Sequence, residues 1–335
     1  MAETPSSPTL PPLPFLTRLK IRLIHILYNN ILRQNGTINR TIINLLVRKT
    51  PPNPTTPIHG VFTTDHHHHH HNLSFRVFTP QTQSQHQKLP LIIYLHGGGF
   101  FVQTADTSNC HTIARNLCFQ LSAIIASLTY RLSPEHKFPS QHQDVFNFLQ
   151  YLSTHPDILP NNADLSNTIL IGDSAGANLA HFAAAQFSPS PSPSTFNSIK
   201  LKAVVLIQPF FGGQERTDSE LRLFHGPVIP VWVTDWMWKA YLPEGADRDH
   251  AACNVTGPNA ADGKELQGFP RSLVVVGGFD PLQDWQRRYC EWLRRAGKEV
   301  DVVEFPNGIH GFYTFPELDE TNMLYEQLRK FVYKL

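Results

Sequence analysis

The sequence predicts an α/β fold in which helices cover both faces of a mostly parallel β-sheet. Short, nearly continuous apolar runs alternate with helical segments through the main body of the chain, which is typical of strands buried on both faces. A glycine-rich turn at 172–176 joins one such run directly to a helical segment. With 335 residues, of which 41% are hydrophobic, the chain can form a single large domain over 1–335.

The segments that precede the sheet are predicted to be helical. Apolar residues recur at helical spacing from 15 to about 32, and a second, shorter helix is expected at 41–48, before a proline-rich stop. Six consecutive histidines follow at 66–71. A purification tag and a natural low-complexity loop both explain this run, and we assign it no catalytic role.

Buried strands and three helices account for most of the remaining chain. The expected strands are 73–78, 89–95, 122–130, 168–171, 201–207, 272–276 and 300–304. The expected helices are 143–152, 175–185 and 323–333.

The segment 214–264 interrupts the alternation and carries several aromatic residues. We expect it to form a cap over the strand ends, together with the helices of 15–50. The alternative is that the segment lies on the surface and forms a small hydrophobic core of its own. The candidate pocket walls, which are equally candidates for cap core, are Phe210, Trp232, Trp236 and Trp238.

Charge and cysteine usage exclude several classes of protein. The formal net charge of +1 gives no reason to expect a nucleic-acid partner. Four separated cysteines form no CxxC pair, which argues against a structural zinc site and fits a reducing compartment. No signal peptide is visible, and the most apolar early stretch, 21–32, is too short and too polar to cross a membrane. We therefore expect a cytoplasmic protein without a membrane span.

The turn at 172–176 has the pattern G-x-S-x-G and places Ser174 between the strand of 168–171 and a helix. Such a strand–turn–helix corner exposes the serine hydroxyl at the edge of a sheet, next to the positive end of the helix dipole. Ser174 is therefore a candidate nucleophile. The alternative is a tight turn whose exposed serine does no chemistry.

A serine nucleophile needs a base and a carboxylate that orients the base, and both are expected after later strands. Asp280 follows a strand and two glycines. It is preferred to Asp284, although Asp280 could also serve as the N-cap of a helix that begins near Pro281. His310 follows the last strand, and it is the only histidine after both Ser174 and Asp280. The order Ser…Asp…His is that of the α/β-hydrolase triad.

Three glycines after a predicted strand offer a site for a negatively charged oxygen. The motif runs from His96 through Gly97, Gly98 and Gly99. Backbone N–H groups of Gly98, Gly99 and Ala175 are the expected oxyanion-hole donors, while Gly97 shapes the turn and His96 braces the loop. A phosphate-binding loop is the competing interpretation, and it lacks the required Gly-Lys-Ser/Thr ending.

These motifs together resemble those of the plant carboxylesterases, in the hormone-sensitive-lipase-like branch of the α/β hydrolases. The resemblance rests on HGGGF at 96–100, GDSAGAN at 172–178, and the surroundings of the late aspartate and histidine. The block YRLSPEH at 130–136 is similar to a family motif that has alanine in place of Ser133. Asn35-Gly36-Thr37 is similar to an early motif that has aspartate in place of Asn35.

The resemblance implies an α/β-hydrolase fold with an N-terminal cap, and hydrolysis of small-molecule esters without a metal or organic cofactor. It leaves the oligomeric state open. The same family contains gibberellin receptors, which keep the serine and the aspartate and lose the histidine. This chain has His310, so an enzyme is favoured over a receptor. Relatives that act as lyases or cyclases in specialised metabolism are a third alternative.

Overall fold

The computed structural model describes residues 11–68, 73–82, 87–187, 196, 198–260 and 266–335. Within these residues one sheet of eight strands forms the centre, in the order β1-β2-β4-β3-β5-β6-β7-β8. β1 and β2 pair antiparallel, β2 meets β4 antiparallel, and the other neighbours are parallel. The strands are β1 Val61–His68, β2 Leu73–Pro80, β3 Leu89–Leu95, β4 Ile124–Thr129, β5 Ala163–Asp173, β6 Leu201–Ile207, β7 Arg271–Phe279 and β8 Val300–Ile309.

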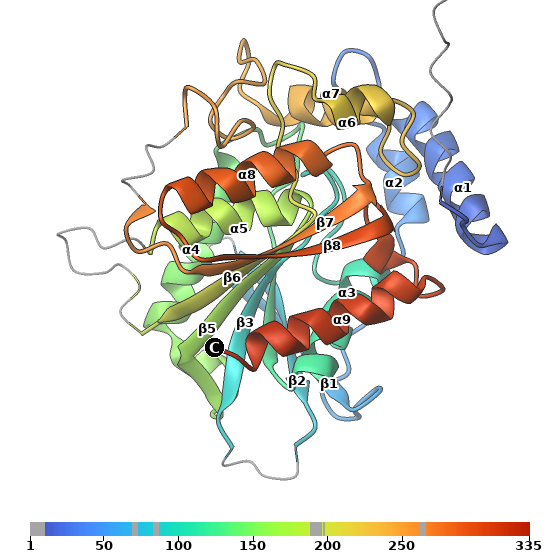
Figure 1. Ribbon diagram of the computed structural model, residues 1–335. Coiled ribbons are helices and arrows are strands. Elements are labelled where there is room, and N and C mark those ends of the chain that lie inside the picture. The colour runs from blue at the N-terminus through green and yellow to red at the C-terminus, as the bar shows by residue number, and fades with distance from the viewer. Residues whose placement is uncertain (1–10, 69–72, 83–86, 188–195, 197, 261–265) are drawn as a thin grey trace, which may run out of the picture.

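Helices cover both faces of the sheet, which confirms the predicted fold class. On one face α3 (Ser108–Leu121) packs against α9 (Asp319–Val332) (Figure 1). On the other face lie α4 (Ser140–Thr154), α5 (Ala175–Ala185) and α8 (Gln283–Arg295). Single 3₁₀ turns occur at Pro156–Ile158 and Phe312–Thr314.

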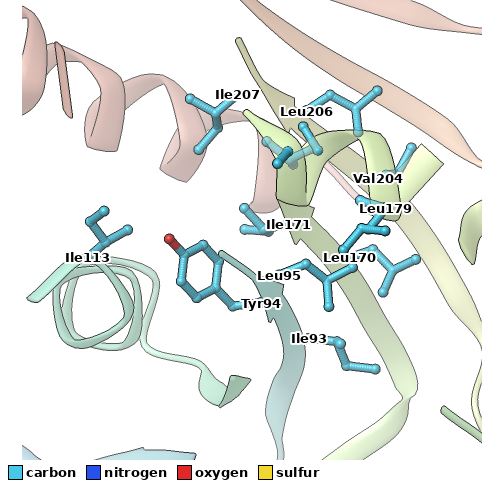
Figure 2. Packing of buried hydrophobic residues seen from close by; sticks show 14 of the residues in the cluster. Ile93, Tyr94, Leu95, Ile113, Leu170, Ile171, Leu179, Val204, Leu206 and Ile207 are labelled. Atoms are coloured by element: carbon cyan, nitrogen blue, oxygen red, sulfur yellow. The ribbon is translucent and has the colours of Figure 1, made fainter. Parts of the chain in front are cut away.

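The core lies on both sides of the central strands, as their continuous apolar sequences predict. Figure 2 shows Ile93, Tyr94 and Leu95 of β3 between Ile113 of α3 and Leu179 of α5. These five side chains are at most 5% exposed. Burial on both faces explains why the strands read as apolar runs rather than as alternating patterns.

Four further helices lie outside the two layers that cover the sheet. They are α1 (Phe15–Ile31), α2 (Arg40–Leu46), α6 (Asp218–Arg222) and α7 (Val231–Tyr241), and α1 occupies the periphery in Figure 1. The Trp236 indole N–H donates to Arg33 O at 2.8 Å, and Lys239 Nζ donates to Gln34 O at 3.0 Å. These bonds attach α7 to the turn between α1 and α2. The limits 15–50 and 214–264 stay predictions, and 261–264 lie outside the described residues.

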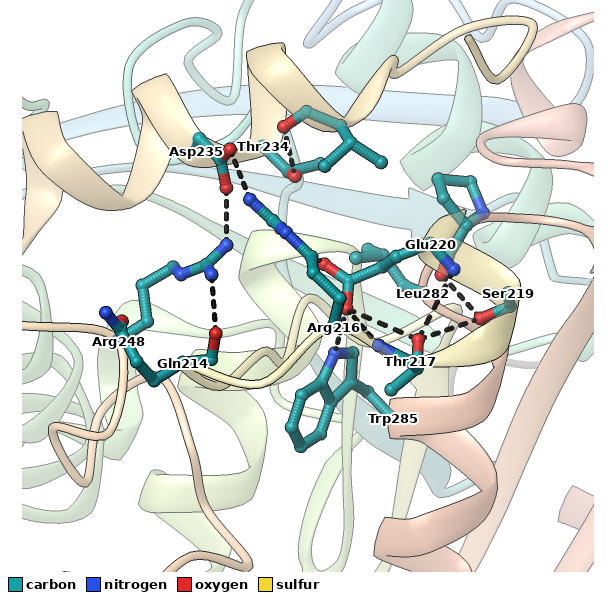
Figure 3. A network of polar contacts seen from close by, with 12 residues as sticks. Gln214, Arg216, Thr217, Ser219, Glu220, Thr234, Asp235, Arg248, Leu282 and Trp285 are labelled. Carbon is teal, nitrogen blue, oxygen red and sulfur yellow. Dashed lines mark hydrogen bonds and ion pairs between the residues drawn. The ribbon is translucent and has the colours of Figure 1, made fainter. Parts of the chain in front are cut away.

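A polar network holds the α6–α7 segment on α8 (Figure 3). Asp235 of α7 pairs with both Arg216 and Arg248. The buried Glu220 of α6 accepts a hydrogen bond from the Trp285 indole N–H at 2.9 Å. The network therefore ties α7 to the start of α8, close to the end of β7.

The histidine run is not a loop where the structure describes it, so that interpretation was wrong for its first three residues. His66, His67 and His68 are the end of β1, a strand that the sequence pattern did not reveal. Pairing with β2 supplies their backbone hydrogen bonds, and the His66 ring stacks on Phe75 at 4.9 Å between ring centroids. The remaining histidines, 69–71, lie outside the described residues. Among the described residues, no helix is long and apolar enough to cross a membrane.

Candidate active site

Ser174 occupies the corner between β5 and α5. Its backbone angles, φ 51° and ψ −116°, lie in a region that side chains other than glycine rarely adopt. A Cβ at Gly176 would overlap the Leu95 carbonyl oxygen, so only glycine allows α5 to start this close to β3. The serine is 8% exposed.

A continuous chain of hydrogen bonds joins the three residues that sequence reasoning selected. His310 Nε2 lies 2.9 Å from Ser174 Oγ, and His310 Nδ1 lies 2.8 Å from Asp280 Oδ2. Asp280 and His310 directly follow β7 and β8, which are neighbours in the sheet. Asp280 is fully buried and His310 is 5% exposed, so bulk water does not weaken these contacts.

The two oxygens of Asp280 have separate partners. Oδ1 accepts from the Leu282 N–H at 2.9 Å, while Oδ2 accepts from Gln286 Nε2 at 2.9 Å as well as facing His310. The expectation that Asp280 is a helix N-cap was wrong, because α8 begins only at Gln283 and Leu282 precedes it. Asp280 instead caps the turn that leads into the helix.

Asp284, the alternative acid, points to a different part of the molecule. Its Oδ2 accepts from the Ser219 N–H at 2.7 Å, and its Oδ1 lies 3.5 Å from Arg287. Its hydrogen bonds among the described residues include none to a histidine. The structure thus brings Asp280, and not Asp284, to the serine and the histidine.

The glycine loop after β3 lies beside the serine. Gly98 and Gly99 have φ of +102° and +59°, and both line the pocket that contains Ser174. Among the described residues, no acceptor takes a hydrogen bond from the N–H of Gly98, Gly99 or Ala175. The Gly97 N–H, in contrast, donates to Asp173 Oδ1 at 3.0 Å.

Asp173 is a residue of the site that sequence reasoning missed. Its carboxylate accepts from Tyr94 OH at 2.6 Å and from Tyr313 OH at 2.9 Å, besides Gly97. Burial raises the pKa of Asp173, and these three donors oppose the rise by stabilising the charged form. The acidic residue before the serine was visible in the sequence, but its partners come from β3, from the loop after β3 and from the 3₁₀ turn after β8, which only the folded sheet brings together.

His96 supports the same loop from the side. Its ring stacks on Tyr130 at 4.2 Å between centroids, and Nδ1 contacts Gly97 O at 2.8 Å. Burial lowers the pKa of His96 to about 4, so the ring is neutral near pH 7. This environment suits a bracing role, as the sequence suggested.

A cavity of about 240 Å³ opens onto Ser174 and His310. Its walls are mostly apolar, and lysine and arginine are absent from the described residues that line it. Of the four candidate wall residues only Phe210 lines it, whereas Trp238 stacks on Phe210 at 4.2 Å and does not line the cavity. The main apolar walls are Ile24, Leu27 and Ile31 of α1, Ile43 and Leu46 of α2, and Val228, Ile229 and Met237.

The part of the chain that the structure describes contains no cluster of three or more histidine, cysteine, aspartate or glutamate side chains placed to hold a metal ion.

Comparison with known proteins identifies the class to which this fold and site belong. The profile of the α/β hydrolase fold family matches residues 92–314, and the chain belongs to that family.

Particular relatives include both receptors and esterases. The chain is 35% identical to the gibberellin receptor GID1B of Arabidopsis thaliana, over 96% of this chain and 92% of the receptor. It is 33% identical to carboxylesterase 20 of the same plant, over 84% and 88% of the two chains. Among solved structures it resembles a hyperthermophilic esterase from Pyrobaculum calidifontis, with a TM-score of 0.73, 25% identity, and 96% and 98% of the two chains covered.

Proposed function

We propose that this chain is a serine carboxylesterase that hydrolyses small-molecule esters through Ser174, His310 and Asp280. The hydrogen-bond chain from Ser174 Oγ through His310 to Asp280, at the base of an apolar pocket, carries the proposal. The carboxylesterases among the relatives support it.

In the proposed reaction, Ser174 Oγ attacks the ester carbonyl carbon while His310 Nε2 takes the hydroxyl proton. Asp280 holds the proton on His310 Nδ1 and stabilises the imidazolium that forms. The N–H groups of Gly98, Gly99 and Ala175 stabilise the oxyanion. His310 then gives its proton to the leaving alcohol, and the acyl group stays on Ser174.

Deacylation repeats these steps with water as the nucleophile. His310 removes a proton from water, the hydroxide attacks the acyl-enzyme, and Ser174 leaves with the proton from His310. Each proton is returned, so the triad ends unchanged and requires no cofactor. The buried free cysteines fit a reducing compartment such as the cytoplasm.

The Ser174→Ala variant tests the nucleophile. We expect kcat for p-nitrophenyl acetate to fall by roughly 10⁴ to 10⁶, because the variant has no group that can form the acyl-enzyme. A fluorophosphonate should label the wild-type chain at Ser174, as read by peptide mass spectrometry, and should not label the variant. Turnover that survives this substitution would exclude the assignment.

A small-molecule receptor is the second candidate, because the relative at 35% identity over 96% of the chain is a gibberellin receptor. A receptor would bind an apolar ligand in the same pocket and would neither turn over esters nor react with the fluorophosphonate. A lyase or cyclase that uses His310 as a base would form its product without water. Incorporation of ¹⁸O from labelled water into the acid product supports hydrolysis and excludes that reaction.

A further inference from the structure

The solvent-facing side of α1 is apolar. Two of its turns place Leu19, Leu23 and Ile26 on one stripe, at the i, i+4, i+7 spacing of a helical face. Phe15 and Leu16 extend the stripe by one turn, and all five side chains are between 42% and 74% exposed. We call these five residues the α1 outer face. A contiguous exposed apolar stripe of this kind is typical of a surface that binds a protein or a membrane.

The charges on the same helix are all positive. Arg18, Lys20 and Arg22 lie within α1, which contains no aspartate or glutamate. Lys20 is paired with Glu317 at 3.0 Å. Arg18 and Arg22 are exposed, and no carboxylate among the described residues pairs with either of them. Both lie beside the apolar stripe: Arg18 is three residues after Phe15, and Arg22 is four residues before Ile26, so each is a neighbour on the helix surface.

The same end of the molecule contains the mouth of the pocket. Ile24 and Leu27, on the inner side of α1, line the cavity above Ser174. Leu46 of α2 lines that cavity too, yet it is 59% exposed, and the adjacent Leu45 is 79% exposed. The apolar surface therefore includes both the outer side of α1 and the residue at the pocket entrance. Figure 1 shows α1 and α2 at the margin of the molecule.

We propose that the α1 outer face, with Arg18 and Arg22, docks on an anionic lipid surface. A helix with leucine, isoleucine and phenylalanine on one side and arginine beside them lies in the headgroup layer, with its apolar side chains among the acyl chains. The arginines remain at the phosphate level, where an anionic surface attracts them. In that orientation the exposed Leu46 brings the pocket mouth to the same surface.

Other occupants fit this surface less well. The preceding segment 1–10 consists mainly of proline, serine, threonine and small residues, so it offers few apolar side chains to cover the stripe. A second copy, paired through the same face, would bring Arg18 and Arg22 against their own counterparts with no acidic residue on α1 to balance them. An acidic protein would match the charge, and a failure of the chain to bind anionic vesicles would favour that partner over a lipid surface.

Flotation of the full chain with lipid vesicles tests the proposal. The probes are vesicles of phosphatidylcholine alone and of phosphatidylcholine with about one third phosphatidylserine. We expect binding to the anionic vesicles only. A triple variant, Leu19→Gln, Leu23→Gln and Ile26→Gln, should lower the partition coefficient of the chain onto anionic vesicles roughly 30-fold. The Arg18→Gln, Arg22→Gln variant should lower it roughly 20-fold, and added salt should weaken binding of the wild-type chain.

The matched control is the variant Phe119→Gln, Met323→Gln, which removes two exposed apolar side chains from α3 and α9. It should bind like the wild-type chain. Circular dichroism and thermal unfolding establish that each variant is folded. Because flotation measures binding alone, the result does not depend on any catalytic activity. The proposal is overturned by no binding to anionic vesicles, by equal binding to neutral ones, or by a wild-type dimer in light scattering that the triple variant converts to monomer. Vesicle binding that is unchanged in both variants overturns it as well.

Discussion

The two sides of the candidate site are built by different forces. We call one side the floor; it consists of Gly97, Gly98, Gly99, Ser174, Asp280 and His310. Its geometry is fixed by hydrogen bonds between buried groups, including the bond from the Gly97 N–H to Asp173. The other side, the roof, comprises α1, α2 and α7, and it presents apolar side chains to the cavity.

The roof is anchored by polar bonds that lie away from the cavity. Trp236 and Lys239 attach α7 to the chain between α1 and α2, and Asp235 attaches it to Arg216 and Arg248. Directional bonds therefore determine the positions of the floor groups, whereas packing determines the shape of the cavity under the roof. We propose that the floor carries out the proposed chemistry and that the roof selects the substrate. The predictions that follow test this division.

The largest effect is expected from Asp280→Asn in the floor. The amide has one oxygen, so it cannot accept from Leu282 N–H and also from His310 Nδ1 and Gln286, as the carboxylate does. The imidazole then loses its fixed tautomer, and kcat for p-nitrophenyl acetate should fall by about 10⁴. Steady-state kinetics at saturating substrate measures it.

Asp284→Asn is the matched control, because Asp284 lies four residues later and faces Ser219 instead of the histidine. It should leave kcat within about threefold of the wild-type value. A loss in Asp284→Asn equal to that in Asp280→Asn would mean that the acid has been assigned to the wrong residue.

The next largest effect is expected where floor and roof touch. A Cβ at Gly99 would lie 2.6 Å from Met237 Sδ of α7, at a φ of +59° that disfavours side chains. Gly99→Ala should therefore displace a proposed oxyanion donor and lower kcat by about 10² to 10³.

The double variant Gly99→Ala, Met237→Ala removes the clash, although not the strain in φ, and should recover about tenfold in kcat. Gly98→Ala provides the comparison, because its Cβ would meet the backbone oxygen of Val102 at 2.6 Å. Met237→Ala should not rescue that variant. Equal rescue of both would mean that Met237 acts in some way other than through contact with Gly99.

A buried histidine beside the floor, His96, predicts that the protein loses stability in acid. The pKa of His96 is lowered to about 4 by burial, whereas an unfolded histidine titrates near 6.5. As the pH falls below 6.5, the unfolded chain binds a proton that folded His96 does not. The free energy of unfolding should therefore fall by about 2 kcal/mol between pH 7.5 and 5 from this group alone. Denaturant unfolding at the two pH values measures the change.

His96→Asn retains a side-chain donor and cannot titrate in this range. Its free energy of unfolding should depend less steeply on pH than that of the wild-type chain, by about the same 2 kcal/mol. An unchanged slope would assign the acid sensitivity to the other buried histidines.

The sequence predicted the floor better than the roof, for a physical reason. Ser174, Asp280 and His310 each follow a strand, and parallel strands bring their carboxyl ends to one edge, so local patterns implied proximity. Asp173 was missed because its partners Tyr94 and Tyr313 come from distant segments and leave no local pattern.

The roof depends on contacts that no periodicity encodes. The tryptophans of 214–264 were equally suited to cap core and to pocket wall, and only the folded structure shows that none of them lines the cavity. β1 was missed because its last three residues are histidines, and their pairing in a strand depends on the partner β2.

The smallest effect is expected in the roof, from Leu27→Gln. Leu27 lines the cavity from the inner side of α1, so the amide places a polar group against the acyl chain of a longer ester. We expect kcat/KM for p-nitrophenyl hexanoate to fall about tenfold, while the value for p-nitrophenyl acetate stays nearly constant. Leu19→Gln makes the same change on the outer side of the same helix, where the side chain is 42% exposed, and should alter neither value. If Leu27→Gln lowered kcat/KM equally for both esters, the roof would be shaping the catalytic geometry. The proposed separation of roles between floor and roof would then be wrong.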